Sequence, residues 1–136
     1  MKDKIRFLLI NPTAEMYRVR KDNNPRHATK IFRISMLPSL YVAAAMPSNV
    51  ETRILDENVE PIDTRASVDL VGLSCSTFNA PRAYEVADAF RARGIPVMLG
   101  GFHPTFMPKE ALQHADAVCV GEAETVLPKQ SSYVVI

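Results

Sequence analysis

Small, hydroxyl-bearing and glycine residues follow three short apolar runs in the second half of the chain. The runs are residues 70–73, 95–99 and 117–120, and the segments that follow them are 74–79 (SCSTFN), 100–105 (GGFHPT) and 121–124 (GEAE). An apolar run with such an ending is typical of a buried parallel strand whose carboxyl end opens into a ligand crevice. Three such endings in succession predict three neighbouring strand ends that face one shared site.

The residue types in these segments favour binding over catalysis. The sequence contains no nucleophile–base set and no cluster of metal ligands, so we expect neither catalytic residues nor a protein-made metal site. Glu122 and Glu124 stand at the predicted start of a helix, where the helix dipole favours carboxylates without any acid–base role. If one strand separates those of Cys75 and Cys119, the two thiols lie roughly 10 Å apart, too far for a disulfide. We interpret both as small buried side chains.

Strands and helices are expected to alternate along the chain. The predicted strands are 5–10, 50–55, 70–73, 95–99 and 117–120, and the predicted helices begin near Pro38, Asn79 and Pro108. The middle helix has the clearest pattern, because Ala83, Val86, Ala87 and Phe90 recur at helical spacing and Gly94 suits its end. This order predicts an α/β fold, a doubly wound, five-stranded parallel sheet of flavodoxin-like or Rossmann-like type.

The predicted binding unit fills residues 1–127, and residues 128–136 are expected to form an irregular tail. Ser131 and Ser132 interrupt any helical pattern there, and the last four residues resemble a strand stub. The helix that should cover the end of the sheet is therefore expected to be short or missing.

Bulk properties exclude several classes of function. The 136 residues suit one domain, and 47% hydrophobic content is enough for a core. A net charge of +1 gives no electrostatic reason to bind nucleic acid or an acidic membrane. The apolar stretch near the N-terminus is too short for a signal peptide, and no run reaches membrane-spanning length. We therefore expect a cytoplasmic protein.

The ends of the first and third predicted strands exclude common nucleotide sites. No Gly-x-Gly-x-x-Gly follows residues 5–10, and the chain has no Gly-x-x-x-x-Gly-Lys-Ser/Thr, so dinucleotide and triphosphate sites are not expected. The first strand ends in 11–14 (NPTA), unlike the hydroxyl-rich loop of a flavodoxin. Ser74 stands where a response-regulator receiver would carry its phosphoacceptor aspartate.

The remaining pattern is an ordered set of short motifs at the strand ends. They are 9–12 (LINP), 38–40 (PSL), 56–61 (DENVEP), 71–74 (VGLS), 99–105 (LGGFHPT) and 120–124 (VGEAE). The set resembles the N-terminal cobalamin-binding domain of vitamin B12-dependent radical SAM enzymes, over residues 4–127. In that family the benzimidazole tail of the cofactor enters a crevice beside strands one, three and four.

The resemblance implies a set of cofactor-binding residues at the strand ends. They are Asn11, Pro12, Ser74, Ser76, Thr77, Gly100, Gly101, His103, Gly121 and Glu122. The two adjacent glycines would line the slot, since glycine lets a ligand approach the backbone closely; a plain strand-to-loop turn is the alternative. Ser74 and Ser76 would bond the tail or its linker, or else cap local backbone. His103 would order its own loop or touch the corrin edge.

The sequence differs from that of many cobalamin-binding domains at the position of the cobalt ligand. Many cobalamin domains place Asp-x-His-x-x-Gly after strand one, and its histidine binds cobalt from below. Residues 11–26 contain no histidine, and the radical SAM group commonly lacks it as well. The implied state has the tail displaced from cobalt with no histidine in its place. His27 in the following segment is the alternative ligand.

The resemblance implies a cobalamin-binding module that does not act as an enzyme on its own. The cysteine motif of the radical SAM half, Cys-x-x-x-Cys-x-x-Cys, is absent, and the chain resembles a detached or truncated cofactor module. Its expected partners are cobalamin, a separate radical SAM subunit, or a second copy through the C-terminal surface. The alternative is a doubly wound interaction or small-ligand domain that binds no cobalamin.

Overall fold

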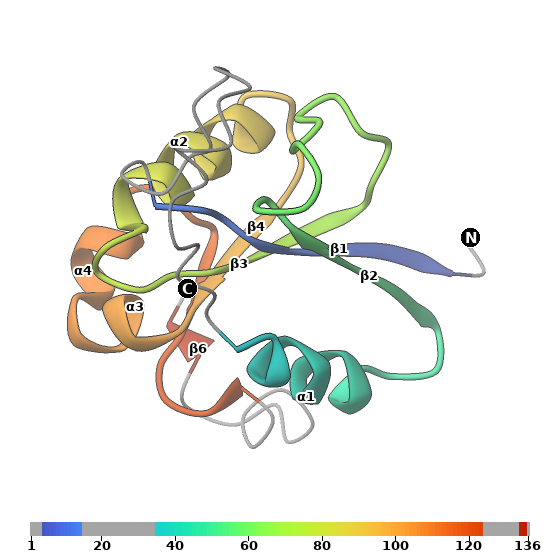
Figure 1. Cartoon of the computed structure of the whole chain (residues 1–136), viewed down its shortest axis with the longest axis horizontal. Helices are drawn as coiled ribbons and strands as arrows, with labels where there is room; N and C mark the ends of the chain where they lie inside the picture. The colour runs from blue at the N-terminus through green and yellow to red at the C-terminus, as the bar shows by residue number, and fades with distance from the viewer. Residues whose placement is uncertain (1–3, 15–34, 124–133, 136) are drawn as a thin grey trace, which may run out of the picture.

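A twisted, mostly parallel sheet forms the centre of the molecule (Figure 1). The computed structural model describes residues 4–14 and 35–123, together with the backbone of residues 134–135. The strands are β1 (Ile5–Asn11), β2 (Val50–Asp56), β3 (Leu70–Ser74), β4 (Val97–Gly100), β5 (Ala117–Cys119) and β6 (Val134–Val135). Their order is β2-β1-β3-β4-β5-β6. The first five pair in parallel, as the sequence predicts.

The two-residue β6 adds an antiparallel strand at the edge of the sheet, next to β5. It falls within the four C-terminal residues, whose sequence predicts a strand stub. The expectation of a short or missing last helix concerns residues 124–133, which lie outside the described part of the chain.

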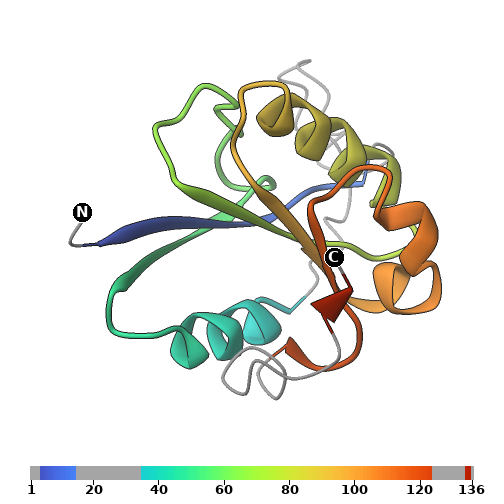
Figure 2. The same ribbon diagram turned by 180° about the vertical axis from the view of Figure 1, so that it is seen from behind.

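Helices cover both faces of the sheet, so the doubly wound prediction is confirmed. Helix α1 (Leu37–Ala45) lies on one face and α2 (Ala80–Arg91) on the other, as Figures 1 and 2 show from opposite sides. The short helices α3 (Phe102–Phe106) and α4 (Pro108–Ala111) connect β4 to β5. Side chains alternate between the faces along each strand, so neighbouring residues serve different layers.

The face under α2 carries the main hydrophobic core. Ala83, Val86, Ala87 and Phe90, whose spacing predicts this helix, are all buried. They pack against alternate residues of the strands, which are Leu8, Ile10, Val71, Leu73, Val97, Leu99 and Val118. Burial of apolar surface drives folding, so this face supplies most of the packing stability.

The face under α1 is filled less completely. The sequence of α1, LPSLYVAAA, carries no charge, and only Ser39 in it is buried. Leu37, Leu40 and Tyr41 are each more than half exposed. An apolar helix normally buries its surface, and here part of the space beneath it remains open.

The connection from β4 to β5 differs from its predicted form. Helix α3 occupies residues expected to form a loop, and the predicted helix at 108–114 is helical only over Pro108–Ala111. Met107 ends α3 and precedes α4, since Pro108 has no backbone N–H to continue the first helix.

Candidate cofactor pocket

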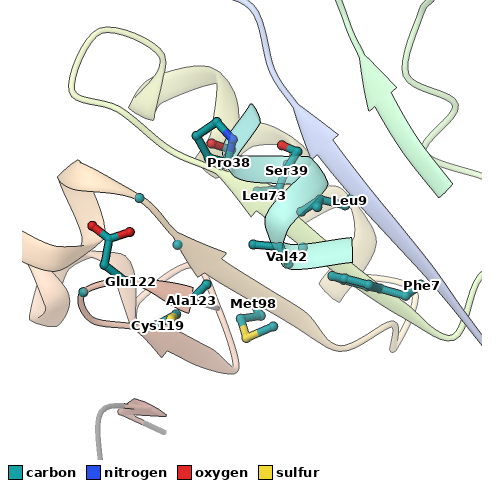
Figure 3. A pocket seen from close by; sticks show the side chains of 15 residues that line it. Phe7, Leu9, Pro38, Ser39, Val42, Leu73, Met98, Cys119, Glu122 and Ala123 are labelled. Carbon is teal, nitrogen blue, oxygen red and sulfur yellow. The ribbon is translucent and has the colours of Figure 1, made fainter. Parts of the chain in front are cut away.

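A cavity of about 120 Å³ lies between α1 and the sheet (Figure 3). Strands β1, β3, β4 and β5 form its floor, and the first turns of α1 form its roof. The lining residues are Phe7, Leu9, Pro38, Ser39, Val42, Gly72, Leu73, Ser74, Met98, Gly100, Gly101, Cys119, Gly121, Glu122 and Ala123. The strand order places it beside the β1/β3 switch point, where open α/β sheets bind their ligands.

The strand register divides the floor into levels of increasing depth. Gly72 pairs with both Leu9 and Met98, and these three residues form the deeper level. Ser74 pairs with Gly100 one step nearer the carboxyl edge. Figure 3 shows Glu122 at one end of the cavity and Phe7 at the other. The cavity is therefore a slot that runs along the strands from the carboxyl edge into the protein.

The adjacent glycines of this slot have different structural roles. A Cβ at Gly100 would lie 3.6 Å from the Cβ of Cys119, an ordinary van der Waals contact, so a small side chain here would fit at the wall of the cavity without a clash. A Cβ at Gly101 would lie 2.6 Å from the carbonyl oxygen of Cys75, and its φ of +112° is unfavourable for other residues. Gly100 leaves space in the slot, whereas Gly101 lets two strand ends approach each other.

Thr105 joins the ends of β4 and β5. Its hydroxyl donates a 2.8 Å hydrogen bond to the carbonyl of Gly101 and accepts one of 3.1 Å from the N–H of Gly121. Gly121 has a φ of +88°, and a Cβ there would meet no atom within 4 Å. Both glycine turns at the slot entrance are thus fixed to one side chain.

His103 lies outside the slot lining and belongs to a polar network beside it. Its Nε2 is 2.8 Å from Oε1 of Glu110, and its Nδ1 is 3.3 Å from the hydroxyl of Thr77. The hydroxyl of Tyr84 donates to the same carboxylate oxygen, at 2.8 Å. These bonds lower the pKa of the Glu110 carboxyl, with the His103 bond as the main cause. His103 and Thr77 together hold the β3 and β4 exit loops near α4.

Asn79 connects the ends of β1 and β3. Its side chain is buried; Nδ2 donates to the carbonyl of Pro12 at 2.9 Å, and Oδ1 accepts from the N–H of Ser76 at 2.7 Å. Asn79 is the residue before α2, as the sequence predicts, but its side chain makes no cap hydrogen bond. Its amide connects the two loops instead. Pro12 and Ser76, the two residues that it bonds, are not among the lining residues of the slot.

Two further contacts fix the β1 end. The side chains of Asn11 and Ser39 bond each other, with an Nδ2–Oγ distance of 2.9 Å, so β1 is tied to α1. Glu57 accepts the N–H of Thr13 at 2.9 Å and forms an ion pair with Arg82 of α2, at 2.6 Å. The bond to Glu57 raises the pKa of Arg82. The roof and floor of the slot are thereby held in place.

The structure brings half of the predicted site residues into the lining. Those are Ser74, Gly100, Gly101, Gly121 and Glu122; the other five are Asn11, Pro12, Ser76, Thr77 and His103. The side chains that close the deep end, Phe7, Leu9 and Met98, are absent from the predicted set. Strand alternation was the signal available for them, because they lie on the same face as Ser74 and Gly100.

The described residues that line the slot include two side chains of types that bind metal ions, those of Cys119 and Glu122. Within residues 4–14 and 35–123, no group of three or more His, Cys, Asp or Glu residues is placed to hold a metal ion. Cys75 and Cys119 lie on either side of β4, as expected, and neither forms a disulfide. Burial raises the pKa of the Cys75 thiol to about 12.

Fold and slot together define a doubly wound cofactor-binding domain. Comparison with known families identifies which one, because residues 33–129 match the B12 binding domain. The chain belongs to this family, and cobalamin is its indicated cofactor. The match confirms the resemblance found in the sequence. The matched residues begin after β1, yet β1 is an interior strand between β2 and β3 and lines the slot.

Two curated relatives come from Chlorobaculum tepidum. The chain is similar to bacteriochlorophyllide d C-8(2)-methyltransferase, with 43% identity over 59% of this chain and 18% of the relative. It is also similar to bacteriochlorophyllide d C-12(1)-methyltransferase, with 35% identity over 68% of this chain and 21% of the relative. The chain thus spans about a fifth of the length of these relatives. No helix among its described residues is long and apolar enough to cross a membrane.

Proposed function

We propose that this chain binds cobalamin with the nucleotide tail in the slot between α1 and the sheet. The observation that carries the proposal is the cavity beside Gly100, where the missing side chain leaves room and an added Cβ would make only one ordinary contact, with Cys119 at 3.6 Å. Bare backbone beside an apolar cavity leaves room for a flat ring. Ser74 and Glu122, nearer the carboxyl edge, would contact the more polar linker between ring and corrin. Cobalamin bound there would supply a cobalt centre that can carry a methyl group.

In this arrangement the base of the tail is displaced from cobalt and no histidine replaces it. No histidine lines the slot in the described residues, and His27, the alternative ligand, lies outside them. Both ring nitrogens of His103 lie within bonding distance of Thr77 and Glu110, which holds the imidazole toward α4. The residues supporting cobalamin would therefore bind its tail and leave the lower face of cobalt without an imidazole.

Equilibrium titration with hydroxocobalamin tests the binding. We expect a visible spectrum typical of a displaced base, and an electron paramagnetic resonance spectrum of the Co(II) form without nitrogen splitting. Splitting that changes when the histidines carry nitrogen-15 would show an imidazole ligand, and loss of that splitting in His27→Ala would identify it. No binding at millimolar cobalamin by folded protein would refute the proposal.

A graded substitution tests the position of the tail. Gly100→Ala and Gly100→Val place progressively more carbon in the slot, so affinity should fall in that order, by about tenfold or more for valine. Ala44→Val is the matched control, because Ala44 is exposed on α1 and outside the lining. Equal affinities for the control and Gly100→Val would place the tail elsewhere.

The same proposal extends to methyl transfer. The two relatives named above are methyltransferases of which the chain matches about a fifth, 18% and 21% of their lengths. We propose that residues 1–127 serve as the cobalamin unit for a radical SAM domain or subunit, with residues 128–136 as a tail. Phe102 and Phe106 of α3, which begins directly after the lining residue Gly101, are 74% and 76% exposed and offer an apolar surface for that contact. Mass measurement of the cobalamin-loaded chain, alone and with such a subunit, tests the association; two separate species in the mixture would oppose it.

A further inference from the structure

The polarity of the slot changes along its length. Its polar side chains, Ser39, Ser74 and Glu122, lie toward the carboxyl edge, at the start of α1 and at the ends of β3 and β5. The deep end is closed by the carbon and sulfur side chains of Phe7, Leu9, Val42 and Met98 (Figure 3). A ligand that enters from the edge therefore meets hydroxyl and carboxylate groups first and an apolar wall last.

The backbone supplies little polarity at the deep end. Residues 7–10 of β1 pair with 70–73 of β3, which in turn pair with β4 from Val97 onward. Because β3 has a paired strand on each side, its backbone N–H and C=O groups are used in hydrogen bonds to β1 and β4. Among the described residues, the single buried side-chain polar atom without a partner is the hydroxyl of Thr52, outside the slot lining. A polar group brought to this depth would meet no hydroxyl, amide or charged side chain among the lining residues, and the strand backbone beside it is already paired in the sheet.

Phe7 fixes the depth of the slot. A Cβ at Gly72 would lie 2.7 Å from the Cζ of the Phe7 ring, so the ring packs directly on this glycine. The ring is almost fully buried, with 1% exposure. Met98, paired with Gly72 on the neighbouring strand, forms the adjoining wall. The shape and polarity of the deep end are thus set mainly by these two side chains.

We propose that this slot selects corrinoids by their lower base, accepting an apolar benzimidazole and rejecting a purine such as adenine, with Met98 and Phe7 as the selecting residues. The inference rests on the proposed function, because it requires the tail in the slot. In both kinds of base the five-membered ring carries the ribose, so the six-membered ring enters first. For benzimidazole that ring carries only carbon and hydrogen, whereas for adenine it carries ring nitrogens and an amino group.

The expected discrimination follows from unpaired polar groups. Burial of an amino group and ring nitrogens without partners is unfavourable enough to weaken binding by about tenfold or more. A site without donors or acceptors discriminates in this way because the polar ligand loses its bonds to water and gains none. Benzimidazole loses no such bonds at its leading edge.

Three corrinoids separate this inference from the proposed function. The full chain is titrated with cobalamin, with the corresponding corrinoid that carries adenine, and with cobinamide, which lacks the nucleotide. We expect cobalamin to bind most tightly, and the adenine corrinoid to bind at least about tenfold more weakly than cobalamin. Equal binding of cobalamin and cobinamide would refute the proposed position of the tail. If cobalamin binds more tightly than cobinamide but no more tightly than the adenine corrinoid, the proposed position of the tail stands and the proposed selection between bases is wrong.

A substitution at Met98 tests which residue selects. Met98→Gln keeps the length of the side chain and places an amide at the deep end, so the preference for cobalamin over the adenine corrinoid should fall severalfold. Met107→Gln is the matched control, because Met107 is exposed and outside the lining. Val42→Thr places a hydroxyl in the roof of the slot, and it replaces Met98→Gln in this test if Met98→Gln does not fold. An unchanged preference in folded variants at both positions would overturn the assignment.

Discussion

Gly100 and Gly101 are adjacent, yet replacement of each by alanine should affect a different property. At Gly101 an alanine would hold a φ of +112°, at a cost of about 1–3 kcal/mol. Its Cβ would also lie 2.6 Å from the Cys75 carbonyl, which accepts a bond from the N–H of His103. Loss of that bond adds about 1 kcal/mol. Gly101→Ala should therefore lower the free energy of unfolding by about 3 kcal/mol.

At Gly100 the backbone has no positive φ, and the nearest atom to an added Cβ is 3.6 Å away. Alanine there should leave the free energy of unfolding within about 1 kcal/mol of the parent, because the more restricted unfolded chain offsets small losses. Urea unfolding followed by circular dichroism measures both variants, and cobalamin titration measures the affinity of Gly100→Ala. Equal losses of stability in the two variants would refute the distinction between a strand contact and a ligand contact.

Three further perturbations test the surroundings of the slot. Asn79→Ala removes the side-chain partner of the buried Pro12 carbonyl and of the part-buried Ser76 N–H, and should cost about 2–4 kcal/mol in urea unfolding; a loss below about 1 kcal/mol would contradict the role of its amide. The hydrogen bond from His103 is the main cause that lowers the pKa of Glu110 in the folded state. The ionised Glu110 carboxylate therefore stabilises the fold fully above its ordinary pKa of 4.5, and this stabilisation is lost as the pH falls through the lower folded pKa. Unfolding curves of Glu110→Gln should then depend less on pH below 4.5 than those of the parent, and parallel curves would oppose this. Cys75, with a pKa of about 12, should resist alkylation at about pH 8 until the chain unfolds; mass spectrometry after labelling would detect early modification.

The sheet was predictable because its strands are defined by local patterns. Runs such as residues 70–73 are apolar throughout and end in small residues, and central parallel strands are buried on both faces. Helix α2 was predictable from the spacing of Val86 and Phe90 and from its boundary residues. Helix α3 was not, because glycine before it and prolines in it and after it are typical of a loop. Its N-terminal turn depends on the tertiary contact between Gly101 and Cys75.

The candidate site was predictable only in part. The sequence places Ser74 and Gly100 at strand ends, and both line the slot. Asn11 and His103 stand at comparable positions, but their side chains bond Ser39 and Glu110 and do not line it. Such side-chain directions depend on contacts between elements distant in sequence. Strand alternation places Met98 on the same face as Gly100, but its role as a wall of the slot depends on α1 covering that face, and the position of α1 follows from the crossover rather than from local sequence.

The unequal filling of the two sheet faces has a consequence for hydrogen exchange. Helix α2 is anchored by a continuous core, whereas α1 lies over a cavity with Leu40 and Tyr41 largely exposed. Segments with few buried contacts open at low free energy, independently of global unfolding. Amides of α1 should thus exchange early in the apoprotein. A guest held beneath this helix would slow them selectively, so protection of α1 would report occupancy without any spectral change at the metal.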